Sequence, residues 1–489
     1  MKLRKTAAFI TALSFIAAVS LGSCGHDPLT DDAVEEVIVP DAPEIPTEEE
    51  TTEEPTEETE PVTEEAEPGE GDTFTIVSWN PEDAPILIAN WIGIDVDDFL
   101  KSEKSYKSPT GADIRFVCFN TGGYDAPDHF DRMFNSGDDI DVYLCEPDWA
   151  LKFLNDDSRS LPVSRLGITE SDIADMYPYT LEQCRDINGV LKAVMWDASP
   201  GCFMYRTDLA EQYLGVKTPD EMQSIVCDWA HFADTAERVA KGSDKKTALA
   251  DSVHGMWDAY KCGFSAPYVS DGEFVLSDEI KDFADMARKL WDCGGLSHDG
   301  QWTDDWYTAG AEGRSMGYFV PSWGFEDDSF AMGVSDGDTL GKWAVCNGPQ
   351  PYFWGGTMLA VNTTSDNMTD ARDFIVSSAF NTDNLRKSAS QMSYLPNNMK
   401  LVEELTAECF SFNNNVSSHF GGQVYYANLD SNARAIDLSG KITEYDADIS
   451  AAVINSIENK YLRDNADWEE TLEFIKDDLS ASCPGLDIR

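Results

Sequence analysis

The chain has 489 residues, which is too long for one hydrophobic core and predicts two lobes. It carries 90 acidic against 35 basic residues, a formal net charge of −55. A surface of that sign repels phosphate backbones, so the charge argues against nucleic acids and anionic polymers as ligands. A neutral or cationic small molecule is compatible with this charge.

The first residues predict export and a lipid anchor. Three basic residues precede an apolar run over 7–21, which is the order of a secretory signal and too short for a membrane-spanning helix. The sequence Leu-Gly-Ser-Cys at 21–24 resembles the lipobox of bacterial lipoproteins, in which the cysteine is acylated. That resemblance implies a signal peptide at 1–23 and lipidation of Cys24 at the extracellular face of the cell membrane. The alternative is an ordinary cleaved signal beside a chance cysteine.

A disordered acidic tether is predicted over 24–72. Between Gly25 and Asp72 there is no Lys or Arg, and 20 of the 48 residues are Asp or Glu. The others are largely Thr, Pro and Ala. Such a segment buries too little apolar surface to offset the entropy lost on ordering it.

The first part of the folded region predicts an alternation of strands and helices. Short apolar, β-branched and aromatic runs predict strands over 73–79, 114–119 and 140–144, of the buried parallel kind. Apolar spacing within 128–137 predicts a helix between the second and third strands. This order is typical of a doubly wound α/β lobe. A polar loop is predicted at 146–149.

Farther along, an extended region is predicted over 189–208 and then a helix. Thr-Pro-Asp-Glu at 218–221 predicts a capping box, and apolar residues follow at helical spacing as far as Ala236. Trp229 lies on that apolar face, so we expect it in the core and not at a ligand. A last amphipathic helix is predicted around 468–479.

Ten cysteines besides Cys24 are scattered along the chain without a C-x-x-C pair or a nearby histidine cluster. An even number in an exported protein permits disulfides, whereas the apolar surroundings of most of these cysteines favour buried free thiols. Both interpretations stay open at this point. We expect no zinc site and no cofactor.

Four segments, in the same order along the chain, resemble the extracellular solute-binding proteins of ABC transporters, specifically the sugar-binding family 1. They are strands at 75–79 and 139–143, the segment 189–209, the stretch 307–317 with Ser-Trp-Gly at 322–324, and Trp-Gly-Gly-Thr-Met-Leu-Ala-Val at 354–361. The chain departs from the family pattern at Trp196-Asp197, where proline is usual, and at Arg206, where asparagine is common.

The resemblance implies an α/β fold of two lobes, periplasmic-binding-protein-like and of type II, with a ligand cleft between the lobes and a hinge of three crossovers. The implied lobes are 73–195 plus 356–396 and 197–355 plus 397–489, with crossings near 194–199, 353–357 and 394–397. Gly355 and Gly356 suit a hinge because glycine tolerates large backbone rotations. The implied function is a monomeric, non-enzymatic lipoprotein that captures a sugar or oligosaccharide and delivers it to the transmembrane subunits of an ABC permease.

A sugar offers an apolar face of C–H groups and a rim of hydroxyls, so its site needs aromatic platforms and polar side chains at their edges. Several tryptophans occur beside polar residues at predicted strand ends and loops, and charged acceptors make strong hydrogen bonds to hydroxyls. The candidate ligand-binding residues are Trp79, Asn80, Glu82, Glu146, Trp149, Trp196, Asp197, Trp302, Trp323, Trp354 and Asn397, and Asp148 is a further candidate for the polar rim.

Three rival functions stay open on the sequence alone. A surface glycoside hydrolase needs only two suitably placed carboxyl groups, but the motifs G-x-S-x-G, H-E-x-x-H and G-x-x-x-x-G-K-[ST] are absent. The same fold could bind a polyamine, a peptide or a metal ion in place of a sugar. It could also serve as a sensor or adhesin that never meets a permease.

Overall fold

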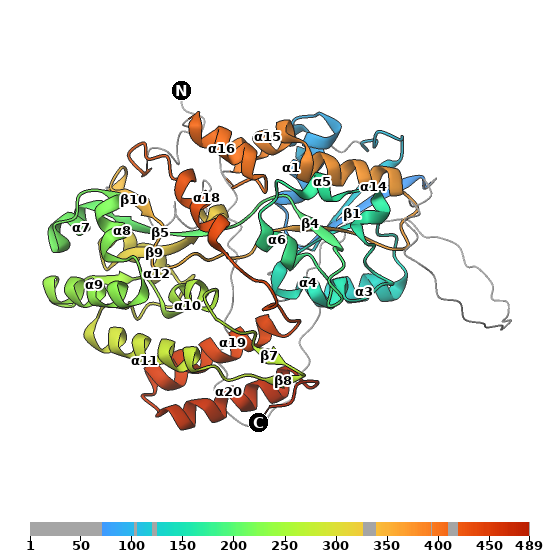
Figure 1. Cartoon of the computed structure of the whole chain (residues 1–489). Helices are drawn as coiled ribbons and strands as arrows, with labels where there is room; N and C mark the ends of the chain where they lie inside the picture. The colour runs from blue at the N-terminus through green and yellow to red at the C-terminus, as the bar shows by residue number, and fades with distance from the viewer. Residues whose placement is uncertain are drawn as a thin grey trace. The chain divides into compact units, whose positions relative to one another are not determined.

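The computed structural model of the chain describes residues 71–101, 105–119, 125–325, 339–392, 394–408 and 419–488. The predicted signal peptide, Cys24 and the tether up to residue 70 lie outside these ranges. The described residues form α/β structure around two separate main sheets (Figure 1). Among them, no helix has the length and apolar character needed to cross a membrane.

The sheet of the N-terminal lobe has the order β2-β1-β3-β11-β4. Its strands are β1 (Thr73–Ser78), β2 (Asp113–Cys118), β3 (Val142–Cys145), β4 (Ala193–Met195) and β11 (Met358–Val361). The predicted parallel pairing is confirmed for β1 with β2 and β1 with β3, while β11 inserts antiparallel between β3 and β4. Strands β1 and β3 are buried almost throughout as expected, but β2 is half-buried because it forms the edge of the sheet.

Helices cover both faces of this sheet, with α1, α14 and α15 on one side and α3 and α4 on the other (Figure 1). The helical elements of this lobe are α1 (Asp83–Ile92), α2 (Val96–Lys101), α3 (Ala126–Ser136), α4 (Pro147–Leu154), η1 (Val163–Leu166), α5 (Glu170–Ile173), α6 (Pro178–Gln183), α14 (Met368–Ile375), η4 (Val376–Phe380) and α15 (Thr382–Met392). Alternate side chains of β1 enter different cores, since Phe74 and Ile76 pack toward α1 and Val77 packs toward α3.

The second sheet has the order β10-β5-β9-β6 and belongs to the C-terminal lobe. Its strands are β5 (Gly201–Arg206), β6 (Ala248–Ala250), β9 (Ser315–Pro321) and β10 (Trp343–Cys346), and a small hairpin adds β7 (Val269–Ser270) and β8 (Glu273–Phe274). Strand β5 pairs antiparallel with β9 and β10, whereas β6 pairs parallel with β9. The predicted extended region at 189–208 therefore contributes one strand to each main sheet.

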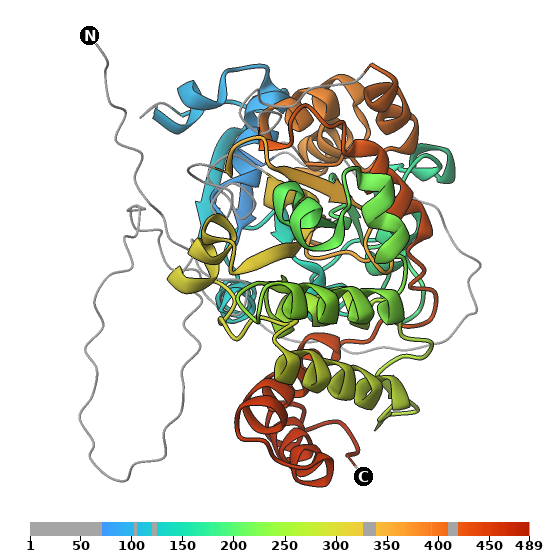
Figure 2. The ribbon, with the colours of Figure 1, turned by 90° about the vertical axis from the view of Figure 1, so that its left-hand side faces the viewer.

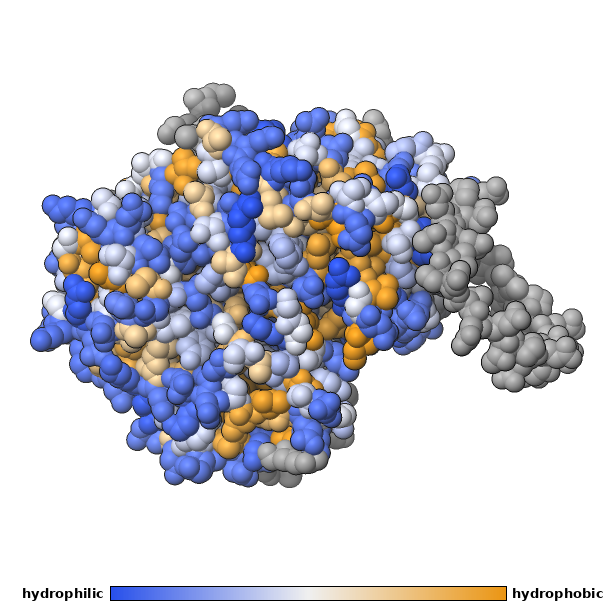
Figure 3. Space-filling view, viewed as in Figure 1, coloured by the Kyte–Doolittle hydropathy of each residue, from blue (hydrophilic) through white to orange (hydrophobic). Residues whose placement is uncertain are grey.

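The helices of this lobe stack in layers beside its sheet. They are α7 (Thr207–Leu214), α8 (Pro219–Ile225), α9 (Trp229–Gly242), α10 (Val253–Lys261), α11 (Asp278–Cys293), α12 (Asp304–Glu312), η2 (Ser322–Phe325), α16 (Met399–Ala407), α18 (Tyr426–Ala435), α19 (Asp446–Ser456), η5 (Ile457–Arg463) and α20 (Trp468–Ser482). Figures 1 and 2 show α9 near the sheet, α11 beyond it, and α19 and α20 farther out. Hydrophilic side chains cover much of the surface over α7 and α9 (Figure 3).

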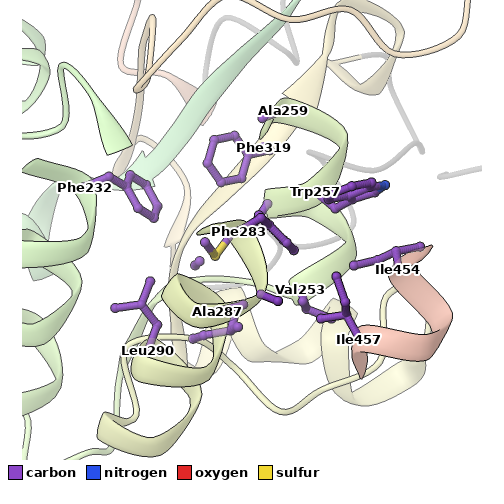
Figure 4. Close-up of a cluster of buried hydrophobic side chains, with 14 of the residues drawn as sticks. Phe232, Val253, Trp257, Ala259, Phe283, Ala287, Leu290, Phe319, Ile454 and Ile457 are labelled. Atoms are coloured by element: carbon purple, nitrogen blue, oxygen red, sulfur yellow. The ribbon is translucent and has the colours of Figure 1, made fainter. Parts of the chain in front are cut away.

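The largest core fixes α10 between the sheet and the outer helices. Phe319 of β9, Phe232 of α9 and Phe283 of α11 lie in one buried cluster (Figure 4). Trp257 of α10 contacts Phe283 with ring centroids 4.9 Å apart, and Ile454 of α19 joins the same cluster. This packing holds the last turn of α10 rigidly, which positions the polar residues at its end.

Two predicted segments differ from the structure. The helix expected from residue 218 is two helices, because Val226 leaves helical geometry and Asp228 caps α9 by accepting the His231 N–H at 2.8 Å. Trp229 packs beside the core as expected, with rings of Phe232 and Phe319 as neighbours. The prediction of a loop at 146–149 is wrong, because α4 begins at Pro147. Proline is tolerated in the first turn of a helix, since an N–H there would have no partner within the helix.

The capping box at the start of α8 is displaced by one residue. The Thr218 hydroxyl accepts the Glu221 N–H at 3.2 Å, as predicted. The Glu221 carboxylate, however, accepts the N–H of Lys217 at 2.7 Å and not that of Thr218. The cap is thus satisfied with a different backbone partner.

The chain passes between the two main sheets three times: from β4 to β5, from β10 to β11, and from α15 to α16. Isolated β-bridges tie these passages together, joining Asp197 to Pro396 and Pro200 to Phe353. The lobe boundaries stated above stay a prediction. Nine cysteines in the described ranges are free thiols with no disulfide among them, and Cys409 lies outside those ranges.

Candidate functional site

The buried carboxyl groups of Asp197 and Asp83 lie close together where the β4–β5 and β10–β11 passages run side by side. The Thr357 N–H donates to Asp197 at 3.1 Å, and its hydroxyl donates to Asp83 at the start of α1. Asp197 is 1% exposed, and this burial, followed by the charge of Asp83, raises its pKa to about 7. Burial likewise raises the pKa of Asp83. This pair forms the base of the junction between the lobes.

Three more of the predicted site residues are buried in the same junction. Asn397 is 0% exposed, accepts the Tyr177 N–H at 3.1 Å and donates to the Met195 carbonyl at 2.9 Å. The Asn80 side chain accepts N–H groups at the start of α1. Trp196 is 1% exposed and stacks on Tyr394, with ring centroids 5.3 Å apart.

Asp197, Asn397 and Trp196 hold the crossover segments together, whereas Asn80 caps the start of α1, and all four side chains are buried in this structure. Sequence reasoning could not separate this structural role from ligand binding, because a polar or aromatic residue at a lobe junction suits either of them.

Three predicted tryptophans from separate segments form one cluster. The ring centroid of Trp354 lies 5.7 Å from that of Trp302 and 5.5 Å from that of Trp323. The Trp302 and Trp323 rings are nearly parallel, with an interplanar angle of 18° and centroids 6.4 Å apart. The Trp323 indole N–H donates to the Trp354 carbonyl at 2.8 Å, which fixes one ring against the other's backbone. All three side chains are half-buried, so part of each indole stays accessible.

The backbone around this cluster is strained and tightly packed. Trp302 has a φ of +66°, a left-handed conformation that costs a bulky residue on the order of 1–3 kcal/mol. Gly355 has a φ of +69°, and a β-carbon added there would lie 3.3 Å from the Trp323 indole nitrogen and 3.4 Å from a Glu146 carboxyl oxygen. The missing side chain at Gly355 therefore lets Glu146 of the N-terminal lobe approach Trp323 of the C-terminal lobe.

The N-terminal lobe contributes carboxyl groups to the region where Glu146 approaches Trp323. Glu146 and Asp148 lie at the end of β3 and the start of α4. Burial first, and then the charge of Asp148, raises the pKa of Glu146, and the protein that surrounds Asp148 raises the pKa of that group, although part of the residue is exposed. The Glu82 side chain is exposed, yet the protein around it and then Asp83 raise its pKa to about 7. Glu82 is therefore accessible to water but largely surrounded by protein, which is the environment of a side chain in a recess of the surface.

The remaining two predicted tryptophans lie in the N-terminal lobe. Trp149 packs on Phe130 and Phe153 with centroids 5.4 Å and 5.9 Å away, and Trp79 borders the same cluster. Their indole N–H groups are buried and have no hydrogen-bond partner among the described residues. The indole N–H of Trp149 lies close enough to the Glu146 carboxyl to lower the pKa of Glu146, although the two groups do not form a hydrogen bond of normal geometry.

A cavity of about 240 Å³ adjoins the tryptophan cluster. Trp302, Trp354 and Asp148 line it, and so do residues that sequence reasoning missed. These are Asp258, Lys261, Tyr268, Gln301 and Asp446. They lie at helix ends and in loops that are distant in sequence, and no local pattern in the sequence marks them as neighbours.

Comparison with known proteins identifies the family. The family model described as bacterial extracellular solute-binding protein matches residues 103–409, more than half of the chain. A search of curated protein sequences found no relative of significant similarity.

Solved structures of similar fold cover most of the chain. A crystal structure of an extracellular solute-binding protein family 1 member has a TM-score of 0.70 at 16% identity, over 83% of this chain and 99% of the other. The galacto-N-biose/lacto-N-biose I-binding protein from Bifidobacterium longum has a TM-score of 0.64 at 14% identity, over 86% of this chain and 100% of the other. A binding protein from B. animalis subsp. lactis in complex with β-1,6-galactobiose has a TM-score of 0.61 at 17% identity, over the same shares. These likenesses confirm the two-lobe fold, and with the family match they show that the chain belongs to the bacterial extracellular solute-binding proteins.

Proposed function

We propose that this protein is an extracytoplasmic lipoprotein that binds a sugar or oligosaccharide between its lobes and delivers it to an ABC importer. The observation that carries the proposal is the cluster of Trp302, Trp323 and Trp354 beside the carboxyl groups of Glu146 and Asp148. Indole faces suit the C–H face of a sugar ring, and carboxylates accept strong hydrogen bonds from its hydroxyls.

The comparisons support a carbohydrate as the ligand class. Two of the similar structures are of proteins crystallised with lacto-N-biose and with β-1,6-galactobiose. Family membership agrees with the prediction of a binding protein and not a glycoside hydrolase. Lipidation at Cys24, docking to permease subunits and the monomeric state are parts of this proposal that rest on the resemblances described in the sequence analysis.

A thermal-shift screen of the full chain in detergent tests the ligand class. The panel contains neutral mono- and oligosaccharides, polyamines and short peptides. A ligand at a hundredfold excess over its Kd adds about 2.7 kcal/mol to the free energy of unfolding. We expect the largest shift from a saccharide, and a panel in which no saccharide shifts the transition contradicts the proposal.

Calorimetry on substituted proteins then tests the site. Trp323→Ala and Trp354→Ala are each expected to weaken saccharide binding tenfold or more. A loss of that size is usual when an aromatic side chain that contacts the ligand is removed. Trp291→Ala is the matched control, because Trp291 is a half-buried tryptophan that stacks on His298 away from the cluster. Normal binding by both cluster variants would show that these rings do not form the site.

A polyamine is the second candidate, favoured by the surplus of carboxyl groups. The pKa values of Glu82, Glu146 and Asp148 are all raised, so a bound cation would relieve the cost of ionising them. The same screen separates the two ligands, because the class that binds more tightly at equal concentration gives the larger shift.

A further inference from the structure

The cavity beside the tryptophan cluster has more acidic than basic groups. Lys261 donates to Asp258 at 2.8 Å within α10, and its charge also acts on Asp148 and Asp446. Asp148 of α4 and Asp446 of α19 bring two more carboxyl groups to the cavity. The Thr443 N–H and hydroxyl hold the Asp446 carboxyl in place at 3.0 Å and 2.5 Å.

The other ionisable residues of the lining do not offset these two carboxyls. Lys441 and the exposed Glu444 carry opposite charges, and the lysine ammonium donates to the Asp437 carbonyl at 3.0 Å. His254 is hydrogen-bonded to Glu458 at 3.0 Å. Four carboxyl groups and two lysines thus line the cavity, and the single ammonium of Lys261 faces the carboxyl groups of Asp258, Asp148 and Asp446 together.

Two buried polar side chains in the lining point to a ligand with hydrogen-bonding groups. Gln301 is 9% exposed, and its side-chain nitrogen has no hydrogen-bond partner among the described residues. Tyr268 is 8% exposed, and its hydroxyl lies near Ser450 without completing a hydrogen bond. An unsatisfied buried group costs about 1–3 kcal/mol, which a bound hydroxyl or ring oxygen would recover.

The size and walls of the cavity suit one sugar ring. Its volume of about 240 Å³ is below the usual range of sites for drug-sized ligands. Trp302, Trp354 and Phe264 contribute aromatic walls. A flat ring with polar edges uses these walls, whereas a linear polyamine has no ring face to place against them.

We propose that this cavity is a subsite for a sugar ring that carries a protonated amine. This inference rests on the proposed function, because it names the class of sugar that the same site holds. The ammonium group sits between Asp148 and Asp446, and ring hydroxyls pair with Gln301 and Tyr268. A neutral or N-acetylated sugar leaves the excess of carboxyl groups over lysines in the lining uncompensated.

Titration calorimetry of the full chain at pH 7 tests the subsite. The probes are glucosamine and galactosamine, their parent sugars glucose and galactose, and the two N-acetylated forms. We expect one of the amino sugars to bind at least tenfold more tightly than its parent and its N-acetylated form. Asp446→Asn is expected to remove most of that preference while leaving the affinity for the parent sugar within threefold.

Two further variants keep the test decisive. Asp148→Asn changes an exposed carboxyl that also lines the cavity, and it is likewise expected to remove most of the preference for the amine; it should also weaken binding of the parent sugar, because Asp148 belongs to the proposed sugar site. Asp448→Asn is the control, because Asp448 is exposed on α19 and does not line the cavity. Equal binding of amine and parent, or a preference that survives both cavity substitutions, overturns the inference but leaves sugar binding intact. Failure of all six sugars also overturns the inference, and if no saccharide of the thermal-shift panel binds while a polyamine does, the proposed function is overturned as well.

Discussion

At the scale of single residues, Lys192 shows how buried charge stabilises the N-terminal lobe. Its side chain is 1% exposed, and its ammonium donates to Asp157 at 2.5 Å and to the Ser160 carbonyl at 3.1 Å. Asp186, whose side chain is also buried, lies 3.9 Å away. Removal of the lysine would leave the Asp186 carboxyl buried without this ion-pair partner.

Lys192→Met is therefore expected to lower the free energy of unfolding by about 3 kcal/mol, in the range for breaking a buried pair. Urea denaturation measures the change, with Lys387→Met on the exposed side of α15 as a control expected to stay within about 0.5 kcal/mol. A loss below about 1 kcal/mol in Lys192→Met would show that water solvates this site.

Asp197 gives a pH-dependent prediction whose sign follows from its burial. Its pKa rises from the usual value near 4 to about 7 on folding, so the folded state binds more protons between these values. The contribution of Asp197 to stability is present below pH 4 and is lost as the pH rises toward 7. The loss is roughly 2–4 kcal/mol, at 1.36 kcal/mol per unit of pKa.

The comparison with Asp197→Asn isolates this effect from other carboxyl groups. Unfolding free energies at pH 4.5 and 7.5 should show wild type losing stability relative to the variant as the pH rises. Asp477→Asn, an exposed substitution on α20, should parallel wild type. Parallel curves for wild type and Asp197→Asn would contradict the raised pKa.

The tryptophans show how far residue-level prediction reached. Trp302, Trp323 and Trp354 occur at predicted loops and lobe junctions, and the fold brings them together. Trp196 fits the same pattern in the sequence and is buried against Tyr394. The sequence gives the position of an aromatic residue along the chain, but not which side of a junction its ring occupies.

At the scale of elements, the second passage between the sheets depends on glycine. Gly356 has a φ of +115°, and a β-carbon there would lie 2.2 Å from the Met195 methyl carbon. Gly356→Ala is expected to cost about 1–3 kcal/mol from backbone strain, with a further cost for moving Met195. Chemical denaturation measures the loss.

Gly440→Ala is the matched control, because Gly440 also has a positive φ of +68° but no neighbour within 4 Å of the added carbon. A larger loss at Gly356 than at Gly440 is the expected result. Equal losses would mean that Met195 moves aside without cost.

Elements with strong local patterns were predicted and others were not. The runs near residues 73, 114 and 140 are short and rich in β-branched and aromatic residues, which favours strands, and all three strands are present, although β2 is only half-buried. The break between α8 and α9 was missed because the apolar spacing continues across it. Only the capping geometry of Asp228, which requires the folded backbone, ends one helix and begins the next.

At the scale of the whole molecule, the anchor and the ligand site are expected to act independently. Cys24→Ala should release the protein from the membrane fraction, because no described helix can span the bilayer and the lipid is the proposed attachment. Its affinity for sugar should match that of wild type in calorimetry. Retention in the membrane fraction would show another attachment, and a changed affinity would couple the tether to the site.

The assembly of the ligand site from distant segments also limited prediction at this scale. The resemblance of four segments predicted two lobes and the passages between them, and the fold agrees with it. The polar lining of the cavity was missed, because Lys261 ends a helix, Gln301 follows a loop and Asp446 begins a helix much later. Only tertiary packing makes these three residues neighbours.

The most direct test of the central claim is a crystal structure of the complex with the saccharide that binds most tightly. We predict electron density for a sugar ring between the lobes, in contact with at least two of Trp302, Trp323 and Trp354 and with a carboxyl group of Glu146 or Asp148. A sugar bound elsewhere on the surface, with these indole rings covered by protein alone, would contradict the account.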